Sequence, residues 1–248
     1  MEANYIIHPI PLQAIDFPKA HMTYLQNYGQ TARTANFIWY VEGPRENIIV
    51  DAGISAERLA ARGYKPDLIQ TLDEGLKKVG LEVSDIDIII ATHSHHDHIA
   101  LARRFPKAKV IIQQAELDFV RNPPPFFEAI RPKDNMELLE GLHFEVVEGD
   151  TKIDKGIELL FTPGHTPGGQ SVAVKTAKGK AVITGWCCIQ ENFDPPPEIK
   201  QKTGLPFMLP GIHTDPIKAY DSIVKVRQFA DLIIPVHELE LVNKATIP

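Results

Sequence analysis

Hydrophobic positions along the chain follow two spacings, one typical of strands and one typical of helices. Short apolar runs rich in β-branched residues predict strands at 5–16, 34–41, 47–50, 86–92, 109–113, 143–147, 157–162, 171–175, 180–184 and 232–236. Apolar residues three to four apart predict amphipathic helices at 67–79 and 216–229, and shorter helices are expected to begin at 100 and 115. This mixture indicates an α/β protein.

Two of these helices have a predicted inner face. In 67–79 it consists of Leu68, Leu72, Leu76 and Val79, and Gly80 closes the helix. In 216–229 the cap-then-proline pair Asp215-Pro216 opens the helix, and the inner face is expected to hold Ile217, Tyr220, Ile223 and Val224.

Two segments rich in proline predict loops. Residues 122–127, Asn-Pro-Pro-Pro-Phe-Phe, cannot continue the preceding helix, and they form either a lid at a pocket mouth or a plain surface connection. Residues 190–211 are long and irregular, and loops of this size are usually functional or mobile. We expect Phe126, Phe127, Phe207, Met208 and Leu209 to form an apolar pocket wall.

Four of the ten histidines fall within six positions, in His93-Ser94-His95-His96-Asp97-His98. The cluster follows the apolar strand 86–92 directly, and open α/β sheets place their sites at such strand ends. Residues two apart in an extended segment point the same way, so His93 and His95 can share one metal, while Asp97 and His98 can face a second. Imidazole and carboxylate are ligands for zinc, iron and manganese. A surface cluster that binds adventitious metal is the simpler alternative.

Two further histidines come directly after predicted strands. His165 lies between turn residues in Pro163-Gly164-His165-Thr166-Pro167, and His237 ends the last strand. Either alone would be weak evidence, but beside the cluster both are candidate ligands.

The stretch Thr92-His93-x-His95-x-Asp97-His98 resembles the signature of the metallo-β-lactamase superfamily of metal-dependent hydrolases. The resemblance implies a four-layer αββα sandwich formed by one domain of residues 1–248. It implies one metal on His93, His95 and His165 and a second on Asp97, His98 and His237, with Asp51 supporting the metal loop. The expected cofactor is Zn²⁺, as two ions, with iron or manganese as alternatives. A metal-bound hydroxide would attack a carbonyl, and Asp97 would orient it and pass a proton to the leaving group.

One turn departs from the superfamily pattern. Where most members have Gly-Asp, with the Asp bridging the metals, this chain has Gly185-Trp186, and no carboxylate follows until Glu191. One branch of zinc β-lactamases has Gly-Gly-Cys at this turn, and Gly185-Trp186-Cys187 has the same spacing. We therefore expect Cys187 to bind the second metal, with Cys188 as the alternative. Two buried cysteines that bind nothing remain the simpler interpretation.

Within the superfamily, the chain is similar to N-acyl homoserine lactone lactonases. The similarity lies in the Asp97-His98 pair, in Gln113-Gln114-Ala115-Glu116-Leu117 and in 210–215, Pro-Gly-Ile-His-Thr-Asp. These lactonases place a tyrosine three residues beyond the bridging Asp, whereas Cys187 plus three is Gln190. The phenolic donor is thus missing or supplied from elsewhere. His213 could contact substrate, although a structural histidine is the simpler interpretation.

The resemblance predicts a hydrolase that opens a lactone, a thioester or a similar small acyl substrate. A mononuclear iron persulfide dioxygenase of the same fold is an alternative, but its site uses the Asp that is absent here. A non-catalytic metal-binding relative is another, because the bridging Asp is lost. Nuclease activity is disfavoured by the net charge of −6, since nucleic-acid grooves are normally basic.

The remaining expectations come from composition. Of the residues, 44% are hydrophobic and 23% charged, as in ordinary globular proteins. No apolar run reaches the length of a membrane span, and the start lacks the layout of a secretory signal. With only two cysteines, which are adjacent, a cytoplasmic protein without a disulfide framework is expected. A homodimer is one candidate assembly.

Overall fold

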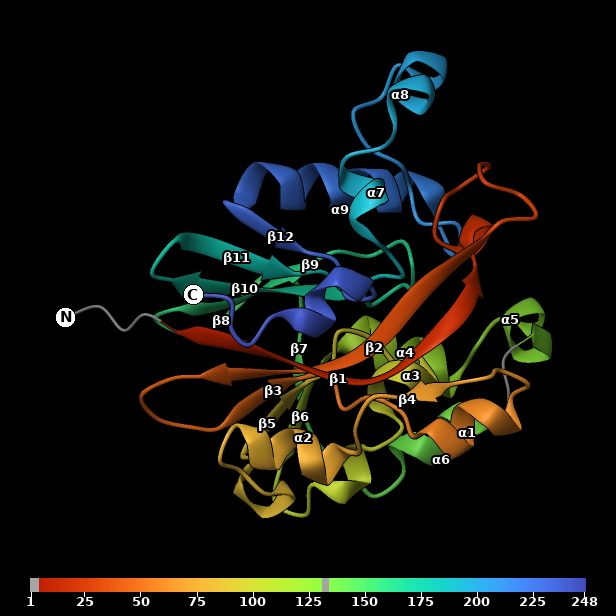
Figure 1. The fold of residues 1–248 in the computed structure, drawn as a ribbon. Helices are drawn as coiled ribbons and strands as arrows, with labels where there is room; N and C mark the ends of the chain where they lie inside the picture. The colour runs from red at the N-terminus through yellow and green to blue at the C-terminus, as the bar shows by residue number, and fades with distance from the viewer. Residues whose placement is uncertain (1–4, 131–133) are drawn as a thin grey trace.

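Two β-sheets packed face to face form the centre of the protein (Figure 1). The computed structural model describes residues 5–130 and 134–248. Within them, the first sheet has the strand order β4-β1-β2-β3-β5-β6-β7 and the second has the order β12-β11-β10-β9-β8. The strands are β1 (Ile6–Pro18), β2 (Thr31–Glu42), β3 (Ile48–Val50), β4 (Asp67–Leu68), β5 (Ile88–Ile90), β6 (Lys109–Gln113), β7 (His143–Val147), β8 (Thr151–Asp154), β9 (Ile157–Phe161), β10 (Gln170–Thr176), β11 (Gly179–Ile183) and β12 (Leu232–Ile234).

Helices cover the outer faces of both sheets, with α9 across the second sheet and α2 and α6 against the first (Figure 1). Their bounds are α1 (Ala56–Ala61), α2 (Leu72–Lys78), α3 (His96–Ile99), α4 (Gln114–Arg121), α5 (Pro125–Ile130), α6 (Asp134–Leu139), α7 (Gln190–Phe193), α8 (Pro197–Thr203) and α9 (Pro216–Phe229).

The alternation of side chains along the strands creates three stacked cores. In β2, Phe37 and Trp39 face the second sheet, whereas Ile38 faces the helices of the first. In β11, Ile183 joins the core between the sheets and Val182 packs beneath α9. Successive residues of a strand point to opposite faces, so each strand contributes to two layers. The order helix, sheet, sheet, helix confirms the predicted four-layer αββα sandwich.

Parallel pairing places several strand ends at one edge of each sheet. Strands β3, β5, β6 and β7 pair in parallel, and β11 pairs in parallel with β12. The carboxyl ends of β5 and of β12 therefore lead into loops at the edges where parallel neighbours also end. His93 and His95 follow β5, and His237 follows β12.

Most predicted strands are confirmed, and 109–113 and 143–147 have the predicted bounds. Strand β8 was not predicted. It has only four residues, and none of them is fully buried, because β8 forms the edge of the second sheet. A strand with this exposure lacks the apolar run that identifies buried strands.

The helix predicted at 67–79 begins later than expected. Asp67–Leu68 is the short strand β4, which pairs with β1, and Leu68 is 57% exposed. Thr71 caps α2 instead, since its hydroxyl accepts from the backbone N–H of Glu74 while the Glu74 carboxylate accepts from the N–H of Thr71. This reciprocal pair fixes the first turn. Leu72 and Leu76 are buried as predicted.

Other helical expectations also need correction. The helix expected to begin at residue 100 is wrong, because α3 covers His96–Ile99 and residues 102–104 form a 3₁₀ turn. The predicted loop 122–127 runs into α5, because proline is well tolerated in a first helical turn. The segment 190–211, expected to be irregular, contains α7 and α8.

Helix α9 has the predicted bounds, and Ile223 is buried as predicted, but the rest of its buried face differs. The other buried residues are Ala219, Ser222 and Val226, whereas Ile217 is 74% exposed and Tyr220 is 39% exposed. The helix is rotated so that small residues approach the turn at Pro163 and Gly164. The Ser222 hydroxyl donates to the Pro163 carbonyl oxygen, and a Cβ at Gly164 would lie 2.3 Å from the backbone N of Ala219.

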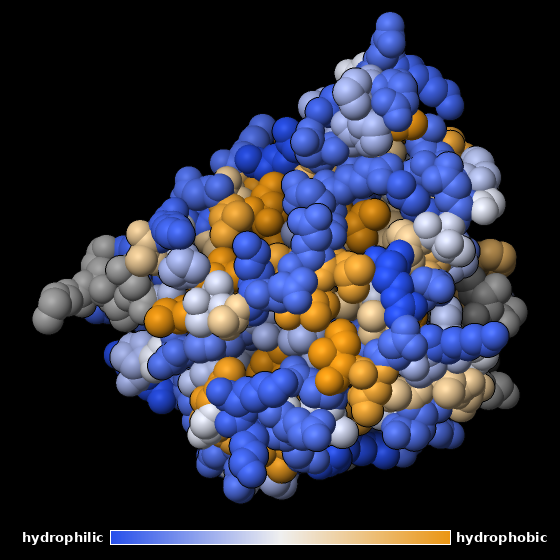
Figure 2. All heavy atoms as spheres, viewed as in Figure 1, coloured by the Kyte–Doolittle hydropathy of each residue, from blue (hydrophilic) through white to orange (hydrophobic). Residues whose placement is uncertain are grey.

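Hydrophilic residues cover most of the face shown in Figure 2, with hydrophobic residues visible in patches between them. Among the described residues, no helix has both the length and the apolar character needed to span a bilayer.

The start of α2 can be tested by the sign of one stability change. Thr71→Ala removes the cap and should lower the free energy of unfolding by about 1 kcal/mol. If the helix instead continued back to residue 67, the same change would be neutral or stabilising, because alanine is the better interior residue. Urea denaturation measures the difference, with the exposed interior position Lys77→Ala as the control.

Candidate metal centre

The predicted ligands from both sheets meet at one edge of the sandwich. His93 and His95 lie in the loop after β5, and Asp97 and His98 lie in α3. His165 comes from the loop between β9 and β10, and His237 follows β12. The structure brings these six residues into two groups, namely His93, His95 and His165, and Asp97, His98 and His237. Within each group, the candidate ligand atoms all lie within 4.8 Å of one another.

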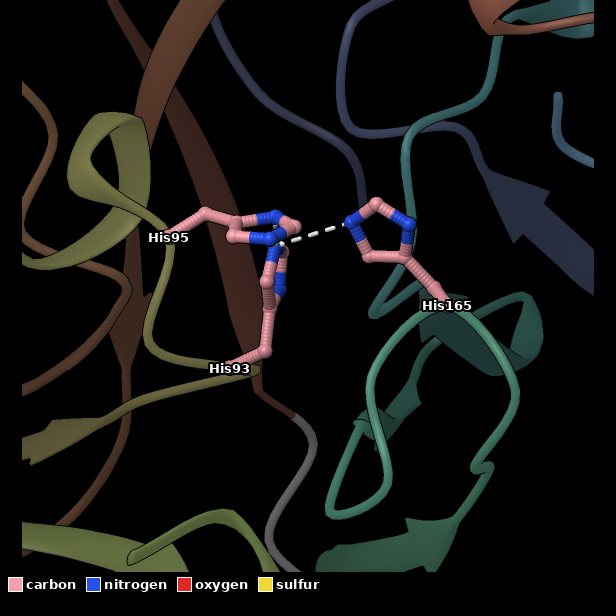
Figure 3. A group of neighbouring side chains, drawn as sticks. All are labelled: His93, His95 and His165. Atoms are coloured by element: carbon pink, nitrogen blue, oxygen red, sulfur yellow. Dashed lines mark hydrogen bonds between the residues drawn. The ribbon is translucent and has the colours of Figure 1, made fainter. Parts of the chain in front are cut away.

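The three histidines of the first group point their ring nitrogens at a common centre (Figure 3). His93 Nε2 lies 3.0 Å from His95 Nδ1 and 3.2 Å from His165 Nε2. Two nitrogens that bind one zinc at 2.0–2.1 Å with tetrahedral angles lie about 3.3 Å apart. The distances between the ring nitrogens therefore match those expected for nitrogens that bind one shared cation.

The hydrogen bonds on the far side of these rings fix where their protons lie. His165 Nδ1 donates to the carbonyl oxygen of Ile212 at 2.6 Å, because a carbonyl can only accept. The Thr92 hydroxyl donates to Asp51, so it accepts from His93 Nδ1 at 3.0 Å. In neutral rings the two Nε2 atoms then present lone pairs to each other, and a cation between them removes that repulsion. Metal-binding histidines commonly donate their other N–H in this way.

The second group combines one carboxylate with two buried histidines. Asp97 Oδ2 lies 3.4 Å from His98 Nε2 and 3.7 Å from His237 Nε2. His98 Nδ1 donates to Asp51 at 2.6 Å, and His237 Nδ1 donates to the Ala35 carbonyl oxygen at 3.3 Å. Asn36 donates to Asp97 at 3.4 Å. The Nε2 atoms of both histidines are thus directed to the same side as the carboxylate.

Charge and burial act in opposite directions on this group. Burial raises the pKa of the Asp97 carboxyl, but His98, His96 and His237 outweigh it and hold the pKa well below its usual value. Burial lowers the pKa of His98, but Asp97 and Asp51 outweigh it and raise the pKa to about 10. For His237 burial dominates, and its pKa falls. Asp97 is therefore ionised at neutral pH.

Asp51 supports the histidine loop as the sequence suggested. Its carboxylate accepts from the backbone N–H of Thr92 at 2.8 Å, from the Thr92 hydroxyl at 3.0 Å and from His98. Its backbone has a φ of 58°, in the left-handed region where non-glycine residues are uncommon. The hydrogen bonds stabilise this strained residue at the end of β3.

Gln170 joins the two sheets directly behind the centre. Its backbone N–H donates to the Thr92 carbonyl oxygen at 2.9 Å, and its side-chain amide donates to the Ala91 carbonyl oxygen at 2.8 Å. Its side-chain oxygen accepts from Gln113 at 2.9 Å. The start of β10 is thereby tied to the ends of β5 and β6, and the loops of His93 and His165 are held at a set separation.

The residues of the turn after β11 lie in different environments. A Cβ at Gly185 would lie 1.8 Å from the carbonyl oxygen of Gln170, so no side chain fits there. Trp186 is buried beneath α9, away from the centre, and Cys188 packs in the same core with its thiol against the Thr184 hydroxyl at 3.1 Å. Cys187 lines the pocket near Asp97, but the structure does not place it in the group of Asp97, His98 and His237. Burial, Asp97 and Cys188 raise the pKa of the Cys187 thiol.

A cavity of about 500 Å³ opens over the two groups. Phe126 and Phe127 line it, as predicted, together with Ile15, Phe17 and Leu59. The expectation for Phe207, Met208 and Leu209 is wrong, because none of them lines this cavity, and Phe207 packs with Trp186 and Phe193 instead.

Two polar residues, His213 and Tyr64, also line the cavity. His213 lines it, and its Nδ1 donates to the Pro210 carbonyl oxygen at 2.9 Å. Tyr64 also lines it and lies near Asp97 and Cys187. Tyr64 follows α1, carries no motif or spacing signal and was not identified from the sequence.

A model of the metallo-β-lactamase superfamily matches residues 32–227. The match covers most of the chain and includes five of the six grouped residues. The chain therefore belongs to the metallo-β-lactamase superfamily.

Curated relatives include an N-acyl homoserine lactonase of a Bacillus species, 34% identical over 108 residues, which are 44% of this chain and 40% of that protein. Another is an N-acyl homoserine lactonase of Rhizobium radiobacter, 28% identical over 114 residues, 44% of this chain and 43% of that protein. The matched part thus spans less than half the length of either relative.

Solved structures show the same fold over nearly the whole chain. One is an N-acyl homoserine lactone hydrolase with the product N-hexanoyl-L-homoserine at its catalytic metal centre, with a TM-score of 0.76, 23% identity and coverage of 97% of this chain and 95% of that one. A dizinc quorum-quenching lactonase has a TM-score of 0.72, 16% identity and coverage of 99% and 91%.

Proposed function

We propose that this protein is a metal-dependent hydrolase that opens the ring of small acylated lactones. The observation that carries the proposal is the pair of converging three-residue groups beneath one cavity. The lactonase relatives and the fold of the lactone hydrolases support the substrate class. Thioesters and other acyl compounds are also candidate substrates, because they present a similar carbonyl group to the attacking water.

The side chains present fit two divalent cations. One cation would be held by His93, His95 and His165, and the other by Asp97, His98 and His237. Cys187 lines the same cavity and would complete the second site. Imidazole and carboxylate suit zinc, iron and manganese, and a thiolate would favour zinc. Two such cations close together supply activated water and polarise a carbonyl oxygen.

Asp97 is the residue we propose for proton transfer. It is the carboxylate of the cluster, it is ionised at neutral pH, and it faces the cavity. An ionised carboxylate can accept a proton from the attacking water and then deliver it to the alkoxide that leaves as the ring opens. The Asn36 amide, which donates to Asp97, keeps the carboxylate oriented.

Cys187 is our proposed replacement for the missing carboxylate. It lies on the cavity wall beside Asp97, whereas Cys188 is fully buried on the other side of the turn. A cation would offset the burial and the negative charge that now raise the pKa of the Cys187 thiol.

The cavity also offers a phenol that could replace the tyrosine of the lactonase pattern, which this chain lacks at Gln190. Tyr64 lines the cavity near Asp97 and Cys187, and its hydroxyl would donate a hydrogen bond to a carbonyl or ring oxygen of the substrate. Burial, Asp97 and Cys187 raise its pKa, so the phenol stays protonated at neutral pH and acts as a donor. The aromatic and aliphatic residues around it, Phe17, Leu59 and Phe127, suit an acyl chain.

The proposal is tested by metal content and hydrolysis together. Purified protein reconstituted with zinc should hold about two ions and open N-hexanoyl homoserine lactone, and a chelator should abolish the activity. His95→Ala should lower the zinc content to about one. A panel with an acyl thioester and a cephalosporin defines the substrate class. One bound iron with oxygen uptake, or no hydrolysis of any substrate by the fully loaded protein, would contradict the proposal.

Cysteine labelling tests the role of Cys187. Alkylation of Cys187 should be slow in the zinc-loaded protein and about tenfold faster after chelation, because a metal-bound thiolate is shielded. Peptide mass spectrometry measures both cysteines, and Cys188 should stay unreactive in both states because it is fully buried. Equal labelling of Cys187 with and without zinc would show that it is not a ligand.

Removal of one hydroxyl tests Tyr64. Tyr64→Phe should lower kcat for the lactone about 10- to 100-fold while the zinc content stays unchanged, since one donor to a developing negative charge is lost. Tyr28→Phe is the matched control, because Tyr28 is 69% exposed and lies outside the cavity. Unchanged kinetics in Tyr64→Phe would remove Tyr64 from the mechanism.

A further inference from the structure

Glu116 is a fully buried carboxylate beside the first group of histidines. It belongs to the first turn of α4, and it is 0% exposed. It is in neither candidate ligand group. A buried carboxylate is costly unless hydrogen bonds satisfy it, so its partners indicate its role.

The partners of Glu116 come from both histidine loops of the first group. Its Oε1 accepts from the backbone N–H of Ser94 at 2.9 Å and from the Ser94 hydroxyl at 2.5 Å. Its Oε2 accepts from the backbone N–H of Gly168 at 3.1 Å. Ser94 lies between His93 and His95, and Gly168 lies three residues after His165. One carboxylate thus spans the two loops.

The loop after His165 is shaped for this contact. A Cβ at Gly168 would lie 2.1 Å from the backbone N of Glu116 and 2.5 Å from its Cα. Only glycine lets the loop come this close to α4, and the closeness brings the Gly168 N–H to the carboxylate. The carboxylate behind the second group is instead Asp51, which accepts from His98 Nδ1 at 2.6 Å.

We infer that Glu116 is a positioning residue that sets the separation of His93 and His95 from His165, and so determines the affinity of the first metal site. This inference rests on the proposed metal sites. A glutamine at this position has one acceptor oxygen, and its amide group would face the N–H of Ser94 or of Gly168, donor against donor. One of the two loops would then be released.

The test measures each site separately with zinc and a chromophoric competing chelator. His237→Ala leaves only the first site intact, and His165→Ala leaves only the second. In the His237→Ala protein, Glu116→Gln should weaken zinc binding about 10- to 100-fold, the usual effect of removing a group that orients ligands. In the His165→Ala protein, Glu116→Gln should change zinc affinity by less than about twofold, since its contacts all lie at the first site.

A milder variant guards against loss of the fold. Ser94→Ala removes one of the three hydrogen bonds and should weaken the first site about threefold to tenfold without affecting the second. If Glu116→Gln does not fold, Ser94→Ala decides the question.

Each outcome separates the two ideas. Equal weakening of both sites, or no weakening of the first, overturns the role of Glu116 while leaving the proposed function intact. Parent protein that binds no zinc at either site overturns the proposed function, and the role of Glu116 with it.

Discussion

The hydrogen bonds of Gln170 hold the two sheets together at the point on which the whole site depends. Each three-residue group takes members from both sheets, so neither exists unless the strand ends stay in register. The apolar core between the sheets favours their packing, but the hydrophobic effect is non-directional and does not fix how the sheets are aligned. The hydrogen bonds from the side-chain amide and the backbone N–H of Gln170 to the carbonyl oxygens of Ala91 and Thr92 fix this alignment. Beyond these strand ends, Asp51 and Glu116 accept hydrogen bonds from the histidine loops.

The two groups differ in how their charge is balanced. The first group consists of three histidines. The Nδ1 atoms of His93 and His165 donate to neutral oxygens, namely the Thr92 hydroxyl and the Ile212 carbonyl. The second contains Asp97 and is backed by the carboxylate of Asp51. At the position where the superfamily resemblance implies an Asp, this chain has Trp186, which is buried beneath α9. The second group is thus where this chain differs from the superfamily signature.

Strand patterns predicted an α/β protein with histidines at several strand ends. The four layers and the two groups of three residues were implied by the resemblance to the metallo-β-lactamase signature, and the structure has both. Prediction from the sequence failed where tertiary packing decides. Phe207 looked like a pocket residue but packs against Trp186, and Ile217 looked buried but lies on the exposed side of α9. The sequence could not identify Tyr64 as a cavity residue, because no local pattern around it predicts that this segment lies near Asp97. Glu116 was part of a family resemblance, yet its bridging contacts appear only when the loops are assembled.

The central claim is that two cations lie in two distinct groups drawn from both sheets. The most direct measurement is anomalous X-ray scattering at the zinc edge from crystals of the zinc-loaded protein. The account predicts two peaks, one among His93, His95 and His165 and one among Asp97, His98 and His237. A single peak, or a peak away from these groups at full zinc content, would contradict it.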